Sequence, residues 1–232
     1  MLKTILFGYR DWAFEIFNEL KSNKKLIILD IVKSQEEYLL KCNNIPPEVD
    51  FLLFVGWSWI IPASITKNFL CLGIHPSDLP FYRGGSPIQH QIIAGLEKSK
   101  VSLMTLSSEQ LDAGDIWIKE DLDLTGKNIK EIFSNISKSS IRMLGKFIED
   151  FKNITPQKQI VTNGSYFKRR SSADSKMSPN DFINNDLKTI YNFIRALTDP
   201  YPNAYIEDVN GNRLVFKEVE YIENKIHCSE SK

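Results

Sequence analysis

The sequence lacks the features that mark several large classes of protein. Its three cysteines, Cys42, Cys71 and Cys228, are far apart and form neither a CxxC pair nor a paired Cys/His spacing. We therefore expect neither a disulfide framework nor a metal site. The formal net charge is zero, with 29 basic and 29 acidic residues. This balance argues against broad binding to nucleic acid and leaves room for one local basic site.

Long hydrophobic runs are also missing. No window approaches the roughly twenty apolar residues of a membrane helix. The N-terminal stretch MLKTILFGYRDW has too short an apolar run for a signal peptide. We therefore expect a soluble, cytoplasmic protein without a membrane partner. The first glycine turn lacks the GxGxxG pattern, so a dinucleotide site is not indicated.

Apolar strands alternate with amphipathic helices in the first two-thirds of the chain. Residues 3–8, 26–32 and 51–56 are typical of buried strands, and residues 11–23 have helical spacing. This alternation predicts an α/β fold, Rossmann-like, with a mostly parallel sheet and helices on both faces. Further strands are expected over 69–74, 101–106 and 116–122, and further helices over 87–96 and 128–151.

The texture changes near residue 150. Residues 155–178 are polar, Ser-rich and locally basic, residues 186–197 have helical spacing, and Asn210-Gly211 is a strong hairpin signal. We predict a catalytic α/β domain over residues 1–150. Residues 151–232 are predicted to form a C-terminal extension with a basic loop, a helix and a β-hairpin. The exposed hairpin edge is compatible with a homodimer.

One histidine stands where a strand is expected to end. His75 lies in LGIHPSDLPFYRGG, residues 72–85, directly after a predicted strand. In open α/β sheets, ligands bind at the carboxyl ends of strands. Two prolines stiffen the turn that follows, and Gly84 and Gly85 permit a ligand to approach the backbone closely. The simpler interpretation is a connecting-loop histidine without a chemical role.

A second stretch, SSEQLDAGD, carries two carboxylates. Asp112 and Asp115 flank a glycine between two predicted strands. One interpretation is a solvated loop. The other is a carboxylate directed at His75, which would orient the imidazole. Such a pair can polarise a carbonyl and manage protons during acyl transfer.

These two stretches carry a family resemblance. LGIHPSDLPFYRGGSPIQ together with EQLDAGDI resembles the folate-dependent formyltransferase family. The stretches KTILFGYRDWA, VGWSWIIP, SYFKRRSSADSKM and YNFIRALTDPYPNAYIE extend the resemblance over nearly the whole chain. The last two are similar to the tRNA and sugar-nucleotide branches of that family.

The resemblance implies transfer of a formyl group from 10-formyltetrahydrofolate to a primary amine. His75 matches the catalytic histidine, which stabilises the oxyanion, and Asp112 matches the catalytic aspartate, which orients the histidine and helps to accept the amine's proton. The residues expected to bind the folate are Trp59, Ile60, Ile61, Ser108, Glu109, Gln110 and Leu111.

One position departs from the family pattern. Gly73 stands where the family has an asparagine that donates a hydrogen bond to the formyl oxygen. Another donor, such as a backbone N–H, a water or Ser77, would replace it. Otherwise the chain is a slow enzyme or a non-catalytic binder.

The expected acceptor is a nucleotide-linked amino sugar for surface glycan biosynthesis. The expected type is a UDP- or dTDP-4-amino-4,6-dideoxyhexose, with a pseudaminic acid precursor as one candidate. The neutral charge and the short stretch after Pro202 fit this small-molecule acceptor better than a tRNA. The alternatives are a compact formyltransferase acting on methionyl-tRNA and a non-catalytic folate or sugar-nucleotide binding protein.

A basic run suits the diphosphate of such an acceptor. Lys168, Arg169 and Arg170 follow an aromatic pair, and arginine matches phosphate oxygens bidentately. A solvated basic loop is the alternative. The full set of expected substrate-binding residues is Tyr9, Arg10, Trp57, Ser77, Arg83, Gly84, Gly85, Lys168, Arg169 and Arg170.

Overall fold

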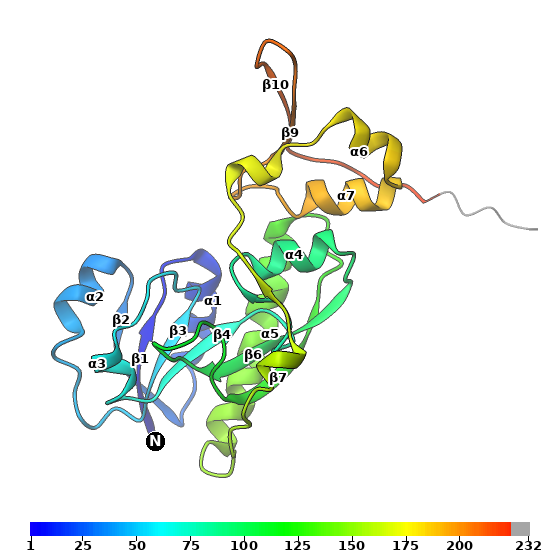
Figure 1. Ribbon diagram of the computed structural model, residues 1–232. Helices are drawn as coiled ribbons and strands as arrows, with labels where there is room; N and C mark the ends of the chain where they lie inside the picture. Colours follow the sequence, from blue (N-terminus) through cyan, green and yellow to red (C-terminus); the bar gives the residue numbers. More distant parts are fainter. Residues whose placement is uncertain (224–232) are drawn as a thin grey trace, which may run out of the picture.

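A six-stranded sheet forms the centre of the computed structural model, which describes residues 1–223 (Figure 1). The strand order is β2-β1-β3-β4-β6-β7. The strands are β1 (Leu2–Phe7), β2 (Leu26–Val32), β3 (Phe51–Val55), β4 (Cys71–His75), β6 (Lys98–Thr105) and β7 (Ile116–Asp123). The first four are parallel, whereas β6 and β7 pair antiparallel. The predicted α/β fold with a mostly parallel sheet is confirmed.

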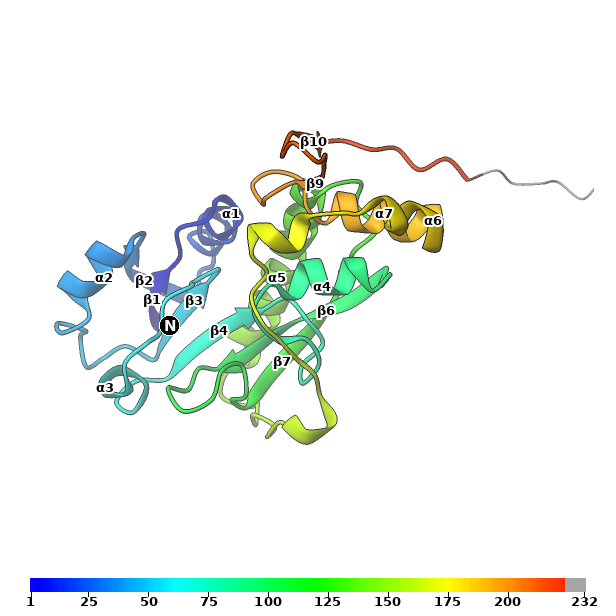
Figure 2. The ribbon, with the colours of Figure 1, turned by 45° about the horizontal axis from the view of Figure 1, so that its top comes forward.

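Helices cover both faces of this sheet, as predicted (Figures 1 and 2). They are α1 (Asp11–Leu20) and α5 (Ile129–Asp150) on one face, and α2 (Gln35–Lys41) and α3 (Ala63–Thr66) on the other. Strand β3 explains why two layers are needed. Leu53 and Val55 join the cluster beneath α1 and α5, while Leu52 and Phe54 join the cluster on the side of α2 and α3. Both faces of the strand are apolar and must be covered.

The longest helix begins where the sequence supplies a cap. The Oδ1 atom of Asn128 accepts a hydrogen bond from the Glu131 backbone N–H at 3.0 Å. Helix α7 (Leu187–Arg195) begins in the same way, because Asp186 Oδ1 accepts from the Thr189 N–H at 2.7 Å. Polar side chains at these positions satisfy N–H groups that have no partner within the helix.

The remaining elements lie around the carboxyl side of the sheet and beyond it. They are β5 (Arg83–Gly84), α4 (Pro87–Ile93), β8 (Tyr166–Phe167), α6 (Pro179–Asn184), β9 (Ala204–Glu207) and β10 (Arg213–Phe216). After α5 the chain runs back along the molecule to α6 and α7 (Figure 1). The predicted hairpin is present as β9 and β10, and a homodimer through its edge stays a prediction.

The C-terminal elements share the main core. Ile190, Ile194 and Ala204 belong to the same buried cluster as α1 and α5. Buried Arg195 donates from Nη1 to the carbonyls of Leu124 and Gly126, each at 2.8 Å. A domain division near residue 150 stays a prediction, because one core spans that point. None of the helices within residues 1–223 has the length and apolar character needed to cross a membrane.

Candidate active site

His75 is the last residue of β4, and its imidazole lies between two acceptors. The residue is 6% exposed. Its Nε2 atom lies 2.8 Å from the carbonyl oxygen of Tyr82, and its Nδ1 atom lies 3.6 Å from Oδ2 of Asp112. A neutral imidazole carries one N–H and serves one acceptor, whereas the protonated ring serves both. Each ring nitrogen thus faces an oxygen atom, and these two contacts orient the ring.

Asp112 reaches His75 from the loop that joins β6 to β7. Its φ is 51°, in the left-handed region that non-glycine residues rarely adopt. Its Oδ2 atom also accepts a hydrogen bond from the Gly84 backbone N–H at 2.9 Å. The structure thus brings together the two residues that the sequence singled out, although they are 37 positions apart.

Gly84 and Gly85 do not leave their space for a ligand, contrary to our expectation. A Cβ at Gly84 would lie 2.3 Å from the carbonyl oxygen of Phe167, and one at Gly85 would lie 2.3 Å from Cα of Arg169. Strand β5 pairs here with β8, a connection that the sequence did not reveal. Because the two glycines have no Cβ, the backbone of Phe167 and Arg169 can pack against them. This packing brings the basic run, residues 168–170, next to the turn that follows His75.

Ser77 and Arg83 are also placed differently from our expectation. Ser77 is fully buried, and its hydroxyl donates to the carbonyl of Phe81 at 2.7 Å. Arg83 is buried as well, and its Nη2 contacts the carbonyl of Val161 at 3.4 Å. Both side chains stabilise the turn after β4 and the segment beside it, so the structure does not favour either as a substrate contact.

Two arginines converge on a pair of hydroxyl groups. Tyr9 Oη donates to Ser58 Oγ at 2.7 Å, Arg10 Nη2 contacts Tyr9 Oη at 3.2 Å, and Arg169 Nη2 contacts Ser58 Oγ at 3.3 Å. We call Tyr9, Arg10, Ser58 and Arg169 the arginine cluster. Within residues 1–223 neither of its guanidinium groups forms an ion pair. The sequence did not single out Ser58, because a lone serine after a strand is not a recognisable pattern.

The other two residues of the basic run take separate paths. Lys168 is exposed, and its carbonyl oxygen lies 3.1 Å from Nε2 of His90. Arg170 turns inward, with its guanidinium carbon 5.5 Å from the ring centroid of Phe193, and donates to the carbonyl of Asp174. Burial lowers the pKa of Arg170 from its usual value. Of the predicted diphosphate triad, only Arg169 therefore joins Arg10.

Tyr201 is a further residue near the cluster that sequence reasoning missed. Burial raises the pKa of its phenol, and the positive charges of Arg10 and Arg169 pull that pKa the other way. Its ring packs beside Phe133 of α5, with ring centroids 5.9 Å apart.

The predicted folate-binding residues lie on two loops, one after β3 and one between β6 and β7, and helix α3 contacts the second. Thr66 Oγ1, at the end of α3, lies 3.5 Å from Ser108 Oγ in the other loop. Ile60 is 86% exposed and Leu111 is 56% exposed, whereas Ile61 is buried. Glu109 and Gln110 are exposed beside Ser108.

Aromatic rings line the first of these loops. The Trp59 ring centroid lies 4.6 Å from that of Tyr9 and 4.7 Å from that of Trp57. Trp57 Nε1 and Tyr38 Oη are both buried without a hydrogen-bond partner among residues 1–223. Burial raises the pKa of Tyr38 to about 12. Trp57 also packs against the second core cluster, the one on the side of α2 and α3.

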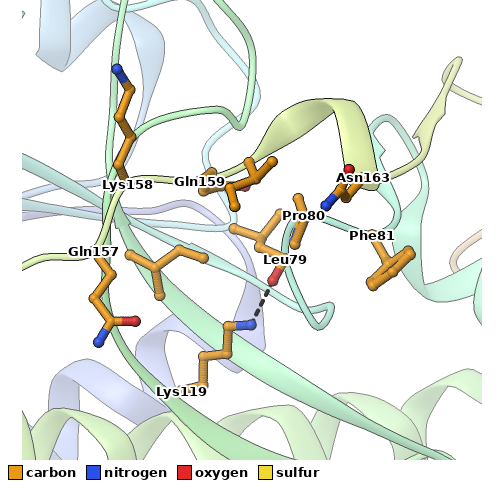
Figure 3. A pocket seen from close by; sticks show the side chains of 10 residues that line it. Leu79, Pro80, Phe81, Lys119, Gln157, Lys158, Gln159 and Asn163 are labelled. Carbon is orange, nitrogen blue, oxygen red and sulfur yellow. Dashed lines mark hydrogen bonds between the residues drawn. The ribbon is translucent and has the colours of Figure 1, made fainter.

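A cavity of about 300 Å³ lies beside the turn after β4 (Figure 3). Leu79, Phe81 and Lys119 contribute to its walls, and Lys119 donates to the carbonyl of Leu79. His75 and Asp112 do not line it. Gln159 lines this cavity and also contacts the Asp112 turn.

Two family models match the chain. The formyl transferase model matches residues 32–139, and the model for the formyl transferase C-terminal domain matches residues 177–231. A methionyl-tRNA formyltransferase of Rickettsia typhi is 32% identical over 186 residues, which are 78% of this chain and 58% of that protein. The chain thus spans little more than half the length of the curated relatives that it matches.

Solved structures agree with this assignment. The methionyl-tRNA formyltransferase from Clostridium thermocellum has a TM-score of 0.81 at 34% identity, covering 97% of this chain and 96% of that chain. A 4-N formyltransferase from Francisella tularensis has a TM-score of 0.75 at 21% identity, covering 96% of this chain and 98% of that chain. This second similarity is one of fold alone. Fold and site define an α/β protein with a histidine–aspartate pair at a central strand end. The chain belongs to the formyl transferase family.

The close contact at Gly85 yields a stability prediction. Gly85→Ala should lower the free energy of unfolding by about 1–3 kcal/mol, because its Cβ has no room beside the Arg169 backbone. The matched control is Gly145→Ala in α5, where nothing lies within 4 Å of the added Cβ. That variant should gain about 0.5–1 kcal/mol, since alanine favours helix. Urea unfolding measures both, and equal midpoints for the two variants would contradict the pairing of β5 with β8.

Proposed function

We propose that the protein is an N-formyltransferase that moves a formyl group from 10-formyltetrahydrofolate to the primary amine of a nucleotide-linked amino sugar. The observation that carries the proposal is the His75–Asp112 pair at the carboxyl end of β4, in a chain of the formyl transferase family. The choice of acceptor rests on the arginine cluster, whose two guanidinium groups suit a diphosphate.

The pair can perform the required chemistry. The acceptor amine bonds to the formyl carbon, and the bond from that carbon to the folate nitrogen breaks. His75 donates an N–H to the formyl oxygen as negative charge develops there, and for this role its Nε2–H must turn from the carbonyl oxygen of Tyr82, 2.8 Å away. Asp112 holds the ring and accepts, directly or through water, the proton that the amine loses. A proton from His75 completes the departing tetrahydrofolate amine, and Asp112 then passes the proton that it took from the acceptor amine to His75, so that the pair returns to its starting state.

The two predicted folate loops offer apolar surface for the formyl donor. Ile60 and Leu111 are exposed apolar side chains, one on each loop, and Thr66 at the end of α3 contacts Ser108 in the second loop. Covering such side chains with a flat ring system removes apolar surface from water. By the family resemblance, the pterin would lie against the backbone of residues 59–61 and of the Asp112 loop.

Gly73 removes one donor from the proposed oxyanion site. A Cβ there would lie 2.6 Å from Cδ2 of Leu106, so a leucine from the Asp112 loop occupies the space of the family asparagine. Ser77 cannot replace that donor, because its hydroxyl is buried and bonded to Phe81. A backbone N–H or a water must serve, and without one the rate would fall by about two to three orders of magnitude.

A second acceptor has its own support. The relatives that are 32% and 34% identical to this chain carry the name methionyl-tRNA formyltransferase. Formyl transfer to methionyl-tRNA is therefore the competing function, and it uses the same His75–Asp112 chemistry.

Turnover decides between the two acceptors. Release of tetrahydrofolate from 10-formyltetrahydrofolate is followed with UDP-, dTDP- and GDP-linked amino sugars and, separately, with initiator methionyl-tRNA. We expect turnover with one of the amino sugars. Turnover with methionyl-tRNA alone would replace the acceptor and keep the reaction. Folate binding without turnover on any acceptor would identify a non-catalytic binder.

The roles of His75 and Asp112 predict a specific loss. His75→Ala should lower kcat by about 10³-fold, and Asp112→Asn by about 10²-fold, since each removes charge or proton control at the reacting atoms. The dissociation constant of tetrahydrofolate, measured by calorimetry, should stay within about twofold. Retained turnover in His75→Ala would refute the mechanism.

The arginine cluster predicts a selective effect on the acceptor. Arg169→Met should raise the KM for the sugar nucleotide by about tenfold, the scale of one lost charge-assisted phosphate contact, and leave the folate KM unchanged. Lys158→Met is the control, because Lys158 is an exposed lysine on the same connecting segment. If both KM values rise equally in Arg169→Met, the diphosphate assignment is wrong.

A further inference from the structure

One buried side chain holds the turn that carries Asp112. Gln159 lies on the segment after α5 and is 7% exposed. Its Nε2 atom lies 3.2 Å from the carbonyl oxygen of Asp112 and 2.6 Å from that of Gly114. The two carbonyls stand on either side of one residue, so the side chain clamps both ends of the turn.

The chemistry of the carboxamide matches this task. Its nitrogen carries two N–H groups and can serve both carbonyls at once. The opposite orientation of the amide would place Oε1 against two carbonyl oxygens, so the two acceptors fix the orientation. The segment that carries Gln159 is itself anchored, because Gln157 and Ile116 exchange both backbone hydrogen bonds at 2.8 Å.

The Asp112 backbone needs such support. A non-glycine residue in the left-handed region costs about 1–3 kcal/mol and persists where its surroundings over-determine it. Residues 107–111, which lead into the turn, are exposed. Beyond the turn, Gly114 packs directly on the backbone of Thr105, whose N–H donates to the Asp115 carbonyl at 2.9 Å. Gln159 therefore fixes the turn from a separate segment of the chain, the one that follows α5.

We propose that Gln159 is a positioning residue for formyl transfer. By holding the Asp112 backbone in its left-handed conformation, Gln159 keeps the carboxylate directed at Nδ1 of His75. The residue acts through Asp112 and does not touch the reacting atoms. This inference rests on the proposed function and adds a third residue to its machinery.

Gln159→Met tests the proposal, because it keeps the length of the side chain and removes both N–H donors. We expect kcat to fall by about 10- to 100-fold while both KM values stay within about twofold, as for a small misplacement of a catalytic group. Gln157→Met is the matched control on the same segment, where the exposed side chain makes no hydrogen bond among residues 1–223. Its kcat should equal that of the wild type.

A double-mutant cycle separates positioning from general destabilisation. In an Asp112→Ala background, measured in single turnovers, Gln159→Met should lower the rate by less than about twofold, because the group that it positions is gone. An equal fold-loss in both backgrounds would overturn the proposal, as would an unchanged kcat in Gln159→Met. Should Gln159→Met fail to fold, Gln159→Asn takes its place, since it withdraws the carboxamide by one methylene.

A spectroscopic readout does not need turnover. In protein labelled with ¹⁵N-histidine, the ring signals of His75 should shift in Gln159→Met and in Asp112→Ala, and not in Gln157→Met. Unchanged His75 signals in Gln159→Met would overturn the positioning role. Wild-type turnover in Asp112→Ala would instead refute the proposed function, so the two failures are distinguishable.

Discussion

One carboxylate oxygen holds the site together. Oδ2 of Asp112 accepts the Gly84 N–H and faces Nδ1 of His75, so three segments meet at one atom. The segments are the end of β4, the turn with β5, and the loop between β6 and β7. Because β5 also pairs with β8, the hydrogen bond from Gly84 to this oxygen also helps to position the basic run, residues 168–170, which directly follows β8. The geometry of the candidate site therefore depends on whether this carboxylate stays where it is.

Local patterns in the sequence predicted the scaffold well. The strands β1 to β4 are short apolar runs and α5 is a capped amphipathic helix, so period and caps suffice for them. His75 was predictable because a strand end is a property of one segment. The close packing around Gly84 and Gly85 was not predictable, because the residues that they contact lie about 80 positions later in the chain. The same limit applies to Arg83 and Arg170, whose partners Val161 and Phe193 are set by tertiary contacts.

The arginine cluster brings two guanidinium groups together in a chain whose formal net charge is zero. Arg10 follows β1, Ser58 follows β3, and Arg169 arrives on the segment beyond β8. Two guanidinium groups bonded to neighbouring hydroxyls repel each other, and no carboxylate among residues 1–223 pairs with either. A bound phosphate would relieve that repulsion. Net charge does not record such an arrangement, since it averages over the whole surface.

The side chain of Leu106 lies directly against Gly73. The glycine lies on β4 and the leucine directly follows β6, and the leucine fills the volume that a side chain at position 73 would need. A side chain at position 73 would require the end of the Leu106 side chain to move. In the proposed mechanism the oxyanion then depends on His75 and on a backbone or water donor, so the support of the Asp112 turn by Gln159 matters more than in a site with a second side-chain donor.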